Sequence, residues 1–388
     1  MRKFLIIIFL LSFFVSSSLA IKITISDPNI RPFRIFLHPY QGNNSLLYEF
    51  LNNTLRSLPN FQVMEEPRSV DFDLKVEDLT EGLKITLNNY KTNEYSIFKI
   101  PSNFSSLYKL MDELYEKITL TRGIFSTKIV FSMNWYSKRE IFLSDIYGKN
   151  IKKLTSNNRD SICPKISHSQ KFIVYTRYEH NGGTSLNLIN LTNFTEKTVY
   201  TSKDLNLAGS FSSDDNYIYF TSYDGKQSKV FKFSLSQNKE QLIYRSSSRI
   251  STPVSSFDNV IIGFVSDELG SPSIFLLNVD NKSIRRVTRS HSYATSPTFP
   301  KENGYLAYLA QIAGKNQIFI TSYDNSELVQ LSYGNTSIDD IVWLKNERFM
   351  LASKFSDNQS YLFLIDIPTQ RYVKLFDIKA NISYLHAN

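Results

Sequence analysis

The sequence is poor in the residues that build cross-links and metal centres. Its 388 residues include one cysteine, Cys163, which excludes an intramolecular disulfide and any site made of several cysteines. No histidine lies within four residues of another, so no helical pair of metal ligands is present. We therefore predict no cofactor and no metal site. The five histidines are His38, His168, His180, His291 and His386.

Motifs of the common enzyme classes are also missing. The sequence contains no G-x-S-x-G elbow, no H-E-x-x-H pair, no Walker loop and no dinucleotide-binding glycine fingerprint. The formal net charge is +8, but the basic residues are scattered rather than gathered in the stripe that nucleic-acid binding requires. These absences predict a protein that is not an enzyme and has no nucleic-acid partner.

The first twenty residues have the pattern of an export signal. Arg2 and Lys3 precede a twelve-residue apolar stretch at 4–15, and the small residues Ser18 and Ala20 follow. As a helix this stretch reaches only ~18 Å, short of the ~30 Å hydrocarbon core, although a signal anchor is the alternative. We predict a signal peptide at 1–20 with cleavage between Ala20 and Ile21, a periplasmic location, and no direct membrane span.

Residues 21–126 mix two periodicities. Apolar and polar residues alternate at 21–26, as on a one-sided strand, and further strand patterns occur at 34–37, 61–64, 72–76, 83–87 and 95–100. Helical spacing appears twice: after Ser45, which we expect to cap the first helix, and from Leu107 to Ile118. This mixture predicts a small α/β domain with an N-terminal arm.

After residue 127 the helical spacing disappears and a repeat begins. Five segments open alike, at Pro164, Gly209, Pro253, Pro297 and Asp340, which lie 45, 44, 44 and 43 residues apart. An apolar strand, a turn and two further strands follow each opening. This spacing is typical of the four-stranded blades of a β-propeller.

The two ends of the repeat indicate how the propeller closes. Three strand patterns without an opening strand occur at 128–132, 139–144 and 150–155, and one opening-type strand at 382–385 has nothing after it. Joining them gives a sixth blade and removes two exposed sheet edges. We predict an all-β six-bladed propeller at 127–388, with one blade closed by the C-terminal strand.

Three stretches carry a resemblance to a known family. They are LTRGIFSTKIVF at 120–131, REIFLSDIYG at 139–148 and FVSDELGSPSIF at 264–275. With the order of signal peptide, α/β domain and propeller, they resemble the TolB family, the periplasmic propeller component of the Tol–Pal system. The family's S-P-D-G turns are degraded here, to SHSQ at 167–170, SSDD at 212–215 and SFDN at 256–259.

The resemblance implies a protein-binding adaptor that supports outer-membrane integrity and cell division. It implies that a Pal-like outer-membrane lipoprotein binds the loops preceding the opening strands, and that a TolA-like inner-membrane protein binds the N-terminal arm by strand addition. The arm residues are Ile21, Lys22, Ile23, Thr24, Ile25 and Ser26. The loop residues are Ser161, Leu205, Ala208, Ser251, His291, Tyr293 and Asp339.

Two alternatives remain open from the sequence. The arm is equally compatible with an ordinary first strand of the α/β domain. The propeller is compatible with a periplasmic enzyme or with a domain that binds a sugar or another small molecule, which aromatic residues along the channel would favour.

Overall fold

The computed structural model describes residues 30–388, apart from residues 81, 101–103 and 302–303. The predicted signal peptide, its cleavage point at Ala20 and Ile21, and the arm at 21–26 lie outside the described residues. In the part of the chain that the structure describes, no helix has both the length and the apolar character needed to cross a bilayer.

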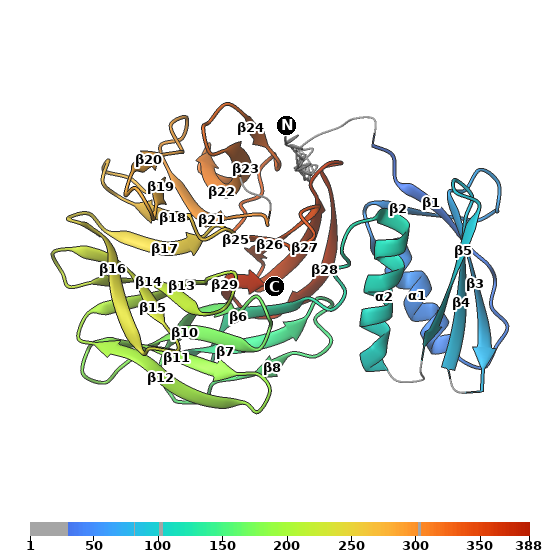
Figure 1. Cartoon of the computed structure of the whole chain (residues 1–388), viewed down its shortest axis with the longest axis horizontal. Coiled ribbons are helices and arrows are strands. Elements are labelled where there is room, and N and C mark those ends of the chain that lie inside the picture. The colour runs from blue at the N-terminus through green and yellow to red at the C-terminus, as the bar shows by residue number, and fades with distance from the viewer. Residues whose placement is uncertain (1–29, 81, 101–103, 302–303) are drawn as a thin grey trace, which may run out of the picture.

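The N-terminal part is a five-stranded sheet with two helices on the face that looks toward the propeller (Figure 1). The strand order is β2-β1-β3-β4-β5; β1 pairs in parallel with β2 and β3, and the other pairs are antiparallel. The elements are β1 (Phe33–Leu37), α1 (Ser45–Ser57), β2 (Phe61–Met64), β3 (Phe72–Leu79), β4 (Gly82–Asn89), β5 (Glu94–Ile100) and α2 (Phe104–Thr119).

Both helices form where the apolar spacing predicted them. In α1 the buried side chains include Leu47, Leu51 and Leu55, which repeat at intervals of four along one face. One detail of the prediction was wrong: Asn44 occupies the N-cap position and Ser45 is the first helical residue, and no side chain caps the helix. The burial of this face, rather than a cap, therefore stabilises α1.

The rest of the chain forms six four-stranded antiparallel sheets arranged around a central axis (Figure 1). This confirms the six-bladed propeller. Blades 1 and 2 consist of β9 (Ser161–Ile166), β10 (Phe172–Tyr178), β11 (Thr184–Asn190), β12 (Thr195–Ser202), β13 (Leu205–Phe211), β14 (Tyr217–Tyr223), β15 (Ser228–Ser234) and β16 (Lys239–Ser246).

Blades 3 to 5 repeat the same order of strands. They consist of β17 (Ile250–Ser255), β18 (Ile261–Ser266), β19 (Ser273–Asn278), β20 (Ile284–Arg286), β21 (Ala294–Thr298), β22 (Tyr305–Ile312), β23 (Lys315–Ser322), β24 (Leu328–Gln330), β25 (Asp340–Trp343), β26 (Phe349–Ser356), β27 (Gln359–Asp366) and β28 (Arg371–Ile378).

Blade 6 joins the two ends of the propeller. Its strands are β6 (Lys128–Trp135), β7 (Lys138–Asp145), β8 (Lys152–Lys153) and the last strand, β29 (Ile382–Ala387), and their order is β29-β6-β7-β8. Ile382 lies opposite Met133 and Ala387 opposite Ile129, so strands some 250 residues apart share one ladder. The shared closing blade is confirmed.

The first strand of each blade lies innermost, and these six strands contact one another in a ring. Hydrogen bonds from a backbone N–H to a side chain join several neighbours. Ser255 N donates to Ser210 Oγ at 2.7 Å, and Leu385 N donates to Asp340 Oδ2 at 2.8 Å. Ile166 N donates to His386 Nδ1 at 3.3 Å, which links blade 1 to blade 6 at the closure.

The repeated proline is explained by a bulge in the inner strands. In β9, β17 and β21 the ladder skips two residues, and the second of them is Pro164, Pro253 or Pro297. Proline has no N–H to donate, so it is tolerated where the ladder is interrupted. In β13 the residue equivalent to these prolines in the repeat is Gly209. A Cβ atom on Gly209 would lie 2.2 Å from Pro253 O of the next blade. Glycine permits that close approach.

The turns that depart from the family's S-P-D-G pattern, at 167–170, 212–215 and 256–259, each end in a residue with left-handed backbone geometry. Gln170, Asp215 and Asn259 each have φ near +60° and donate their N–H to the serine three residues earlier. Asp and Asn tolerate this region and also add side-chain acceptors. Asp215 Oδ1 accepts from His168 N at 2.7 Å, so the turn of blade 2 is bonded to the turn of blade 1.

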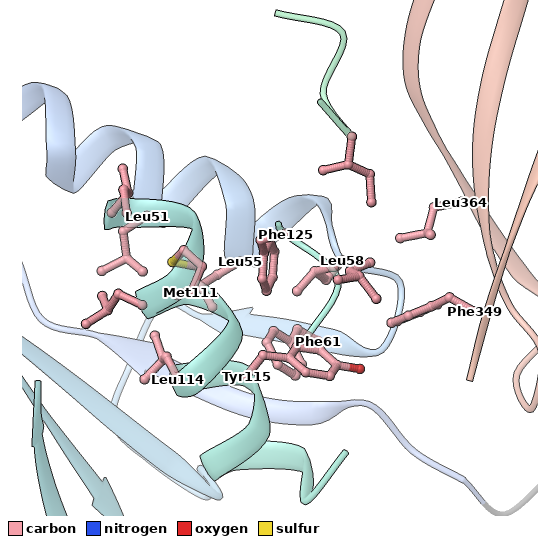
Figure 2. Close-up of a cluster of buried hydrophobic side chains, with 14 of the residues drawn as sticks. Leu51, Leu55, Leu58, Phe61, Met111, Leu114, Tyr115, Phe125, Phe349 and Leu364 are labelled. Atoms are coloured by element: carbon pink, nitrogen blue, oxygen red, sulfur yellow. The ribbon is translucent and has the colours of Figure 1, made fainter. Parts of the chain in front are cut away.

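The helices of the N-terminal part and the side of the propeller share one apolar core (Figure 2). Tyr115 of α2 is central: its ring centroid lies 5.4 Å from that of Phe61 and 6.2 Å from that of Phe349 in blade 5. Asn60 Nδ2 donates to Tyr115 Oη at 3.0 Å. A continuous core of this kind couples the folding of the two parts.

A carboxylate fixes the connection between α2 and the propeller. Asp112 accepts hydrogen bonds from Phe125 N at 2.7 Å, from Ser126 N at 3.1 Å and from Ser126 Oγ. Burial raises the pKa of Asp112, and these three donors oppose the shift.

Candidate partner-binding surfaces

The propeller has two faces that differ in which loops they present. Because the inner strands all run in the same direction along the axis, their beginnings lie on one face and their ends on the other. We call the first the leading face; it also carries the turns between the second and third strands. We call the second the trailing face.

The channel opens on the leading face as a cavity of about 410 Å³. We call it the leading mouth. Its titratable lining residues include Lys165, Asp339, Asp340 and His386, with Tyr384 and Phe355 among the aromatic residues. Burial raises the pKa of Asp340 to about 6, while Lys165 and the donors Ile341 N and Leu385 N oppose that shift. Burial lowers the pKa of His386 well below its usual value, so this imidazole is neutral and accepts from Ile166 N.

Four of the seven predicted loop residues are at least partly exposed on the leading face. Ser251 and Asp339 line the leading mouth, and Asp339 Oδ2 accepts from Phe355 N. Leu205 and Ser251 line an adjacent hollow of about 310 Å³. Tyr293 is half-buried, and its carbonyl accepts from Gln311 N at 3.1 Å.

The other three predicted residues are buried. Ala208 is 1% exposed and packs in the core between blades 1 and 2, and Ser161 is 0% exposed. His291 is 8% exposed; its Nδ1 lies 3.2 Å from Tyr308 Oη, and its ring centroid lies 4.2 Å from that of Phe319. Burial lowers the pKa of His291. These three side chains support the leading face from below.

Sequence reasoning missed the most exposed apolar side chains of this face. Tyr136 is 93% exposed at the tip of the β6–β7 turn, and its ring meets that of Trp135 edge-on at 5.6 Å. Large apolar side chains are exposed at or near the ends of strands on the leading face, one or two from each blade. The set is Trp135, Tyr136, Tyr178, Leu205, Leu269, Ile312, Tyr333 and Phe355. The adjacent Trp-Tyr pair at the tip of a predicted hairpin was the available signal.

A second hollow, of about 380 Å³, lies between α1 and the propeller. We call it the interdomain groove. Leu46 and Phe50 of α1 line one side, and Tyr147, Lys149 and Lys374 line the other. Leu46 is exposed, and Lys149 Nζ lies 5.1 Å from the ring centroid of Phe50.

Among the described residues, no group of three or more His, Cys, Asp and Glu side chains is placed so that it could hold a metal ion. Cys163 is buried in the bulge of β9, and burial raises the pKa of its thiol to about 12. A thiol in this state is a poor nucleophile at neutral pH.

Comparison with known proteins gave consistent matches. Residues 115–383 match the model of the TolB beta propeller domain. The Tol-Pal system protein TolB of Desulfotalea psychrophila is 24% identical over 176 residues, which is 45% of this chain and 38% of that protein. The protein of the same name from Desulfosudis oleivorans is 26% identical over 142 residues, 37% of this chain and 31% of that protein. The matched segments thus span about a third of the length of these relatives.

Among solved structures, TolB from Acinetobacter baumannii has a TM-score of 0.81 at 17% identity and covers 93% of this chain and 98% of its own. The TM-score shows a shared fold, and at this identity the match shows the fold alone. The family model, in contrast, covers most of this chain, from the end of α2 to the closing strand β29. The chain is therefore a member of the TolB propeller family.

Proposed function

We propose that this protein is a periplasmic adaptor of the Tol–Pal system that binds two protein partners and links them. A Pal-like outer-membrane lipoprotein docks on the leading face, and a TolA-like inner-membrane protein binds the arm at Ile21, Lys22, Ile23, Thr24, Ile25 and Ser26. The names of the curated relatives support membership of this system. The twenty-residue signal pattern supports export.

The observation that carries the proposal is the set of large apolar side chains exposed on the leading face. Protein interfaces are enriched in Tyr, Trp and Phe, and this set contains five such residues out of eight. Charged groups lie beside them, including Arg139, Asp160 and Glu179 near Tyr178. Exposed aromatic side chains with charged groups beside them are typical of a surface that docks a folded partner.

The experiment for the leading face uses Tyr136→Ala, with Tyr372→Ala as the matched control. Tyr372 is 71% exposed but lies in β28, the outermost strand of blade 5. Affinity for the soluble domain of the Pal-like lipoprotein from the same organism is measured by calorimetry. We expect Tyr136→Ala to weaken binding by about thirtyfold, corresponding to ~2 kcal/mol for a central aromatic, and Tyr372→Ala to leave it unchanged. Equal affinities for both variants would reject this face.

The arm has its own experiment. Ile23→Pro removes a backbone donor from a segment proposed to add to a sheet edge, so it should weaken binding of the TolA-like protein and leave the lipoprotein bound. Thr24→Val is the control, because it keeps the donor and the β-branched shape. If Ile23→Pro binds the TolA-like protein as tightly as wild type does, the arm does not bind this partner and is only a structural strand.

Export has a direct test as well. N-terminal sequencing of the protein recovered from the periplasm should give Ile21 as the first residue. Recovery of a chain that begins at Met1 would contradict cleavage after Ala20.

A further inference from the structure

The opposite end of the channel forms a second, smaller cavity. Its volume is about 80 Å³, and the ends of all six inner strands or the turns that follow them contribute to it. We call it the trailing mouth. Its titratable side chains are His168, Lys301, Lys345 and His386, and its described lining includes no aspartate or glutamate.

Lys345 is the central cation of the trailing mouth. Its side chain is half-buried, and its Nζ donates to the carbonyl oxygen of His168, a neutral acceptor. No ion pair joins Lys345 or Lys301 to another residue that the structure describes. Burial, together with the charges of Arg122 and Lys301, lowers the pKa of Lys345 to about 8, and Asp215 opposes the shift. Lys345 thus remains largely charged at neutral pH without a carboxylate bound to it.

The nearby carboxylate of Asp215 is already engaged. Its Oδ1 accepts from His168 N at 2.7 Å and its Oδ2 from Ser169 N at 2.8 Å, which holds the turns of blades 1 and 2 together. Both oxygens therefore accept from backbone donors on the turn, and no ion pair between Asp215 and Lys345 is present among the described residues.

The walls of the trailing mouth are largely aromatic. Phe257 contacts both a lysine and a histidine: Lys301 Nζ is 5.6 Å from its ring centroid, and the His168 ring meets it edge-on at 5.8 Å. Burial lowers the pKa of His168, so Lys301 is the cation of this contact. Trp343 and Phe299 complete the wall. His168 Nδ1 is buried and has no hydrogen-bond partner among the described atoms. A polar atom in that state is costly until a ligand or water bonds it.

We propose that the trailing mouth binds one oxyanion, a carboxylate or phosphate group that a larger ligand presents to it. About 80 Å³ holds two or three water-sized groups at ~30 Å³ each, which suits a single such group. Lys345 and Lys301 supply charge, and the unpartnered Nδ1 of His168 is buried in the same wall. The leading mouth differs, because Asp339 and Asp340 lie beside Lys165 there and oppose the binding of an anion. This inference is independent of the partners proposed above.

The test measures anion binding by the mature protein with Lys345→Gln and a matched control. Lys171→Gln removes one lysine from an exposed position of the same face that does not line the cavity. Calorimetry is performed at low ionic strength with inorganic phosphate, acetate and a short glutamate-rich peptide as three separate probes. The phosphate arm and the two carboxylate arms distinguish the two possible sources of the oxyanion.

We expect wild type and Lys171→Gln to bind at least one probe at one site, and Lys345→Gln to bind it about tenfold more weakly. If Lys345→Gln does not fold, the exposed variant Lys301→Gln takes its place with an expected loss of about threefold. Equal loss in Lys171→Gln would mean non-specific attraction to the face and would overturn the site. The absence of saturable binding of all three probes to wild type would overturn it as well.

Discussion

The two mouths of the channel are built from the same six inner strands, and they differ in size, charge and surroundings. The leading mouth encloses about 410 Å³, contains both lysine and aspartate, and lies on the face with the exposed aromatic and aliphatic side chains. The trailing mouth encloses about 80 Å³ and contains four basic side chains. The strands fix where the mouths lie, whereas the loops at each end decide what they can bind.

This contrast separates the residues that hold the propeller from those that meet a partner. The inner strands carry the bulges and the hydrogen bonds between blades. Residues of these strands, such as Ala208 and Ser161, are buried. Exposed residues such as Tyr136 extend beyond that framework. Mutations in the two groups should therefore act on different quantities, the free energy of unfolding in the first and the affinity for a partner in the second.

The largest effect is expected from removing the strand that both mouths share. Deletion of residues 382–388 leaves the inner edge of β6 without a partner strand and removes the buried side chains of Ile382 and Leu385. At ~1.5–3 kcal/mol for each large apolar side chain, and with further loss of ladder hydrogen bonds, the free energy of unfolding should fall by at least ~4 kcal/mol. Chemical denaturation measures this. An unchanged midpoint in the truncated protein would contradict a shared closing blade.

A smaller effect is expected for Ala208→Trp. Because Ala208 packs between blades 1 and 2, with its N–H donated to Thr176 Oγ1 at 2.9 Å, a tryptophan overpacks the core. The free energy of unfolding should fall by ~3 kcal/mol. Leu205→Trp, at an exposed position three residues earlier, should change it by less than ~0.5 kcal/mol. Full stability of Ala208→Trp would mean that this residue lies on the surface.

Asp340 of the leading mouth should make the stability of the folded protein depend on pH. The pKa of Asp340 is raised from 3.8 to about 6, so the folded protein binds a proton more tightly than the unfolded chain. The contribution of Asp340 to the free energy of unfolding should therefore be greatest below pH 4 and should fall as the pH rises from about 4 to 6.

Asp340→Asn removes this titration and keeps an oxygen for Leu385 N. It should raise the free energy of unfolding by ~1–3 kcal/mol at pH 7 and leave it unchanged at pH 4. Thermal unfolding at the two pH values measures the difference. A variant that is equally or less stable at pH 7 would show that the carboxylate is compensated by its surroundings.

The smallest effect on stability is expected at the tip of the β6–β7 turn. Tyr136→Ala removes a side chain that is 93% exposed, so the free energy of unfolding should change by less than ~0.5 kcal/mol. Thermal unfolding checks that a loss of partner affinity in this variant does not come from a loss of structure. A drop of several degrees would assign Tyr136 a structural role instead.

The blades could be predicted from the sequence because strand alternation and turn residues are local signals. The regular spacing of the openings from Pro164 to Asp340 predicted five blades. The lone strand pattern at 382–385, joined to the three at 128–155, predicted the sixth. The reason for the proline was not visible, because a bulge depends on the pairing of two strands. The capping role expected of Ser45 was wrong since Asn44 takes that position.

The leading mouth could be predicted only in outline. The segments before the inner strands lie together on the leading face, but the burial of Ala208, Ser161 and His291 depends on neighbouring blades that no local pattern reports. The trailing mouth was missed because His168, Lys301 and Lys345 are far apart in sequence and meet only through the ring of six blades.

The most direct test of the account is a footprint of the Pal-like lipoprotein domain on this protein by hydrogen exchange. The proposed adaptor role requires that bound lipoprotein protect the leading face, in particular the turns at 135–138, 179–183 and 267–272. The turns of the trailing face at 167–171 and 299–301 should exchange as in the free protein. Protection of the trailing turns with no change at 135–138 would contradict the assignment of the leading face.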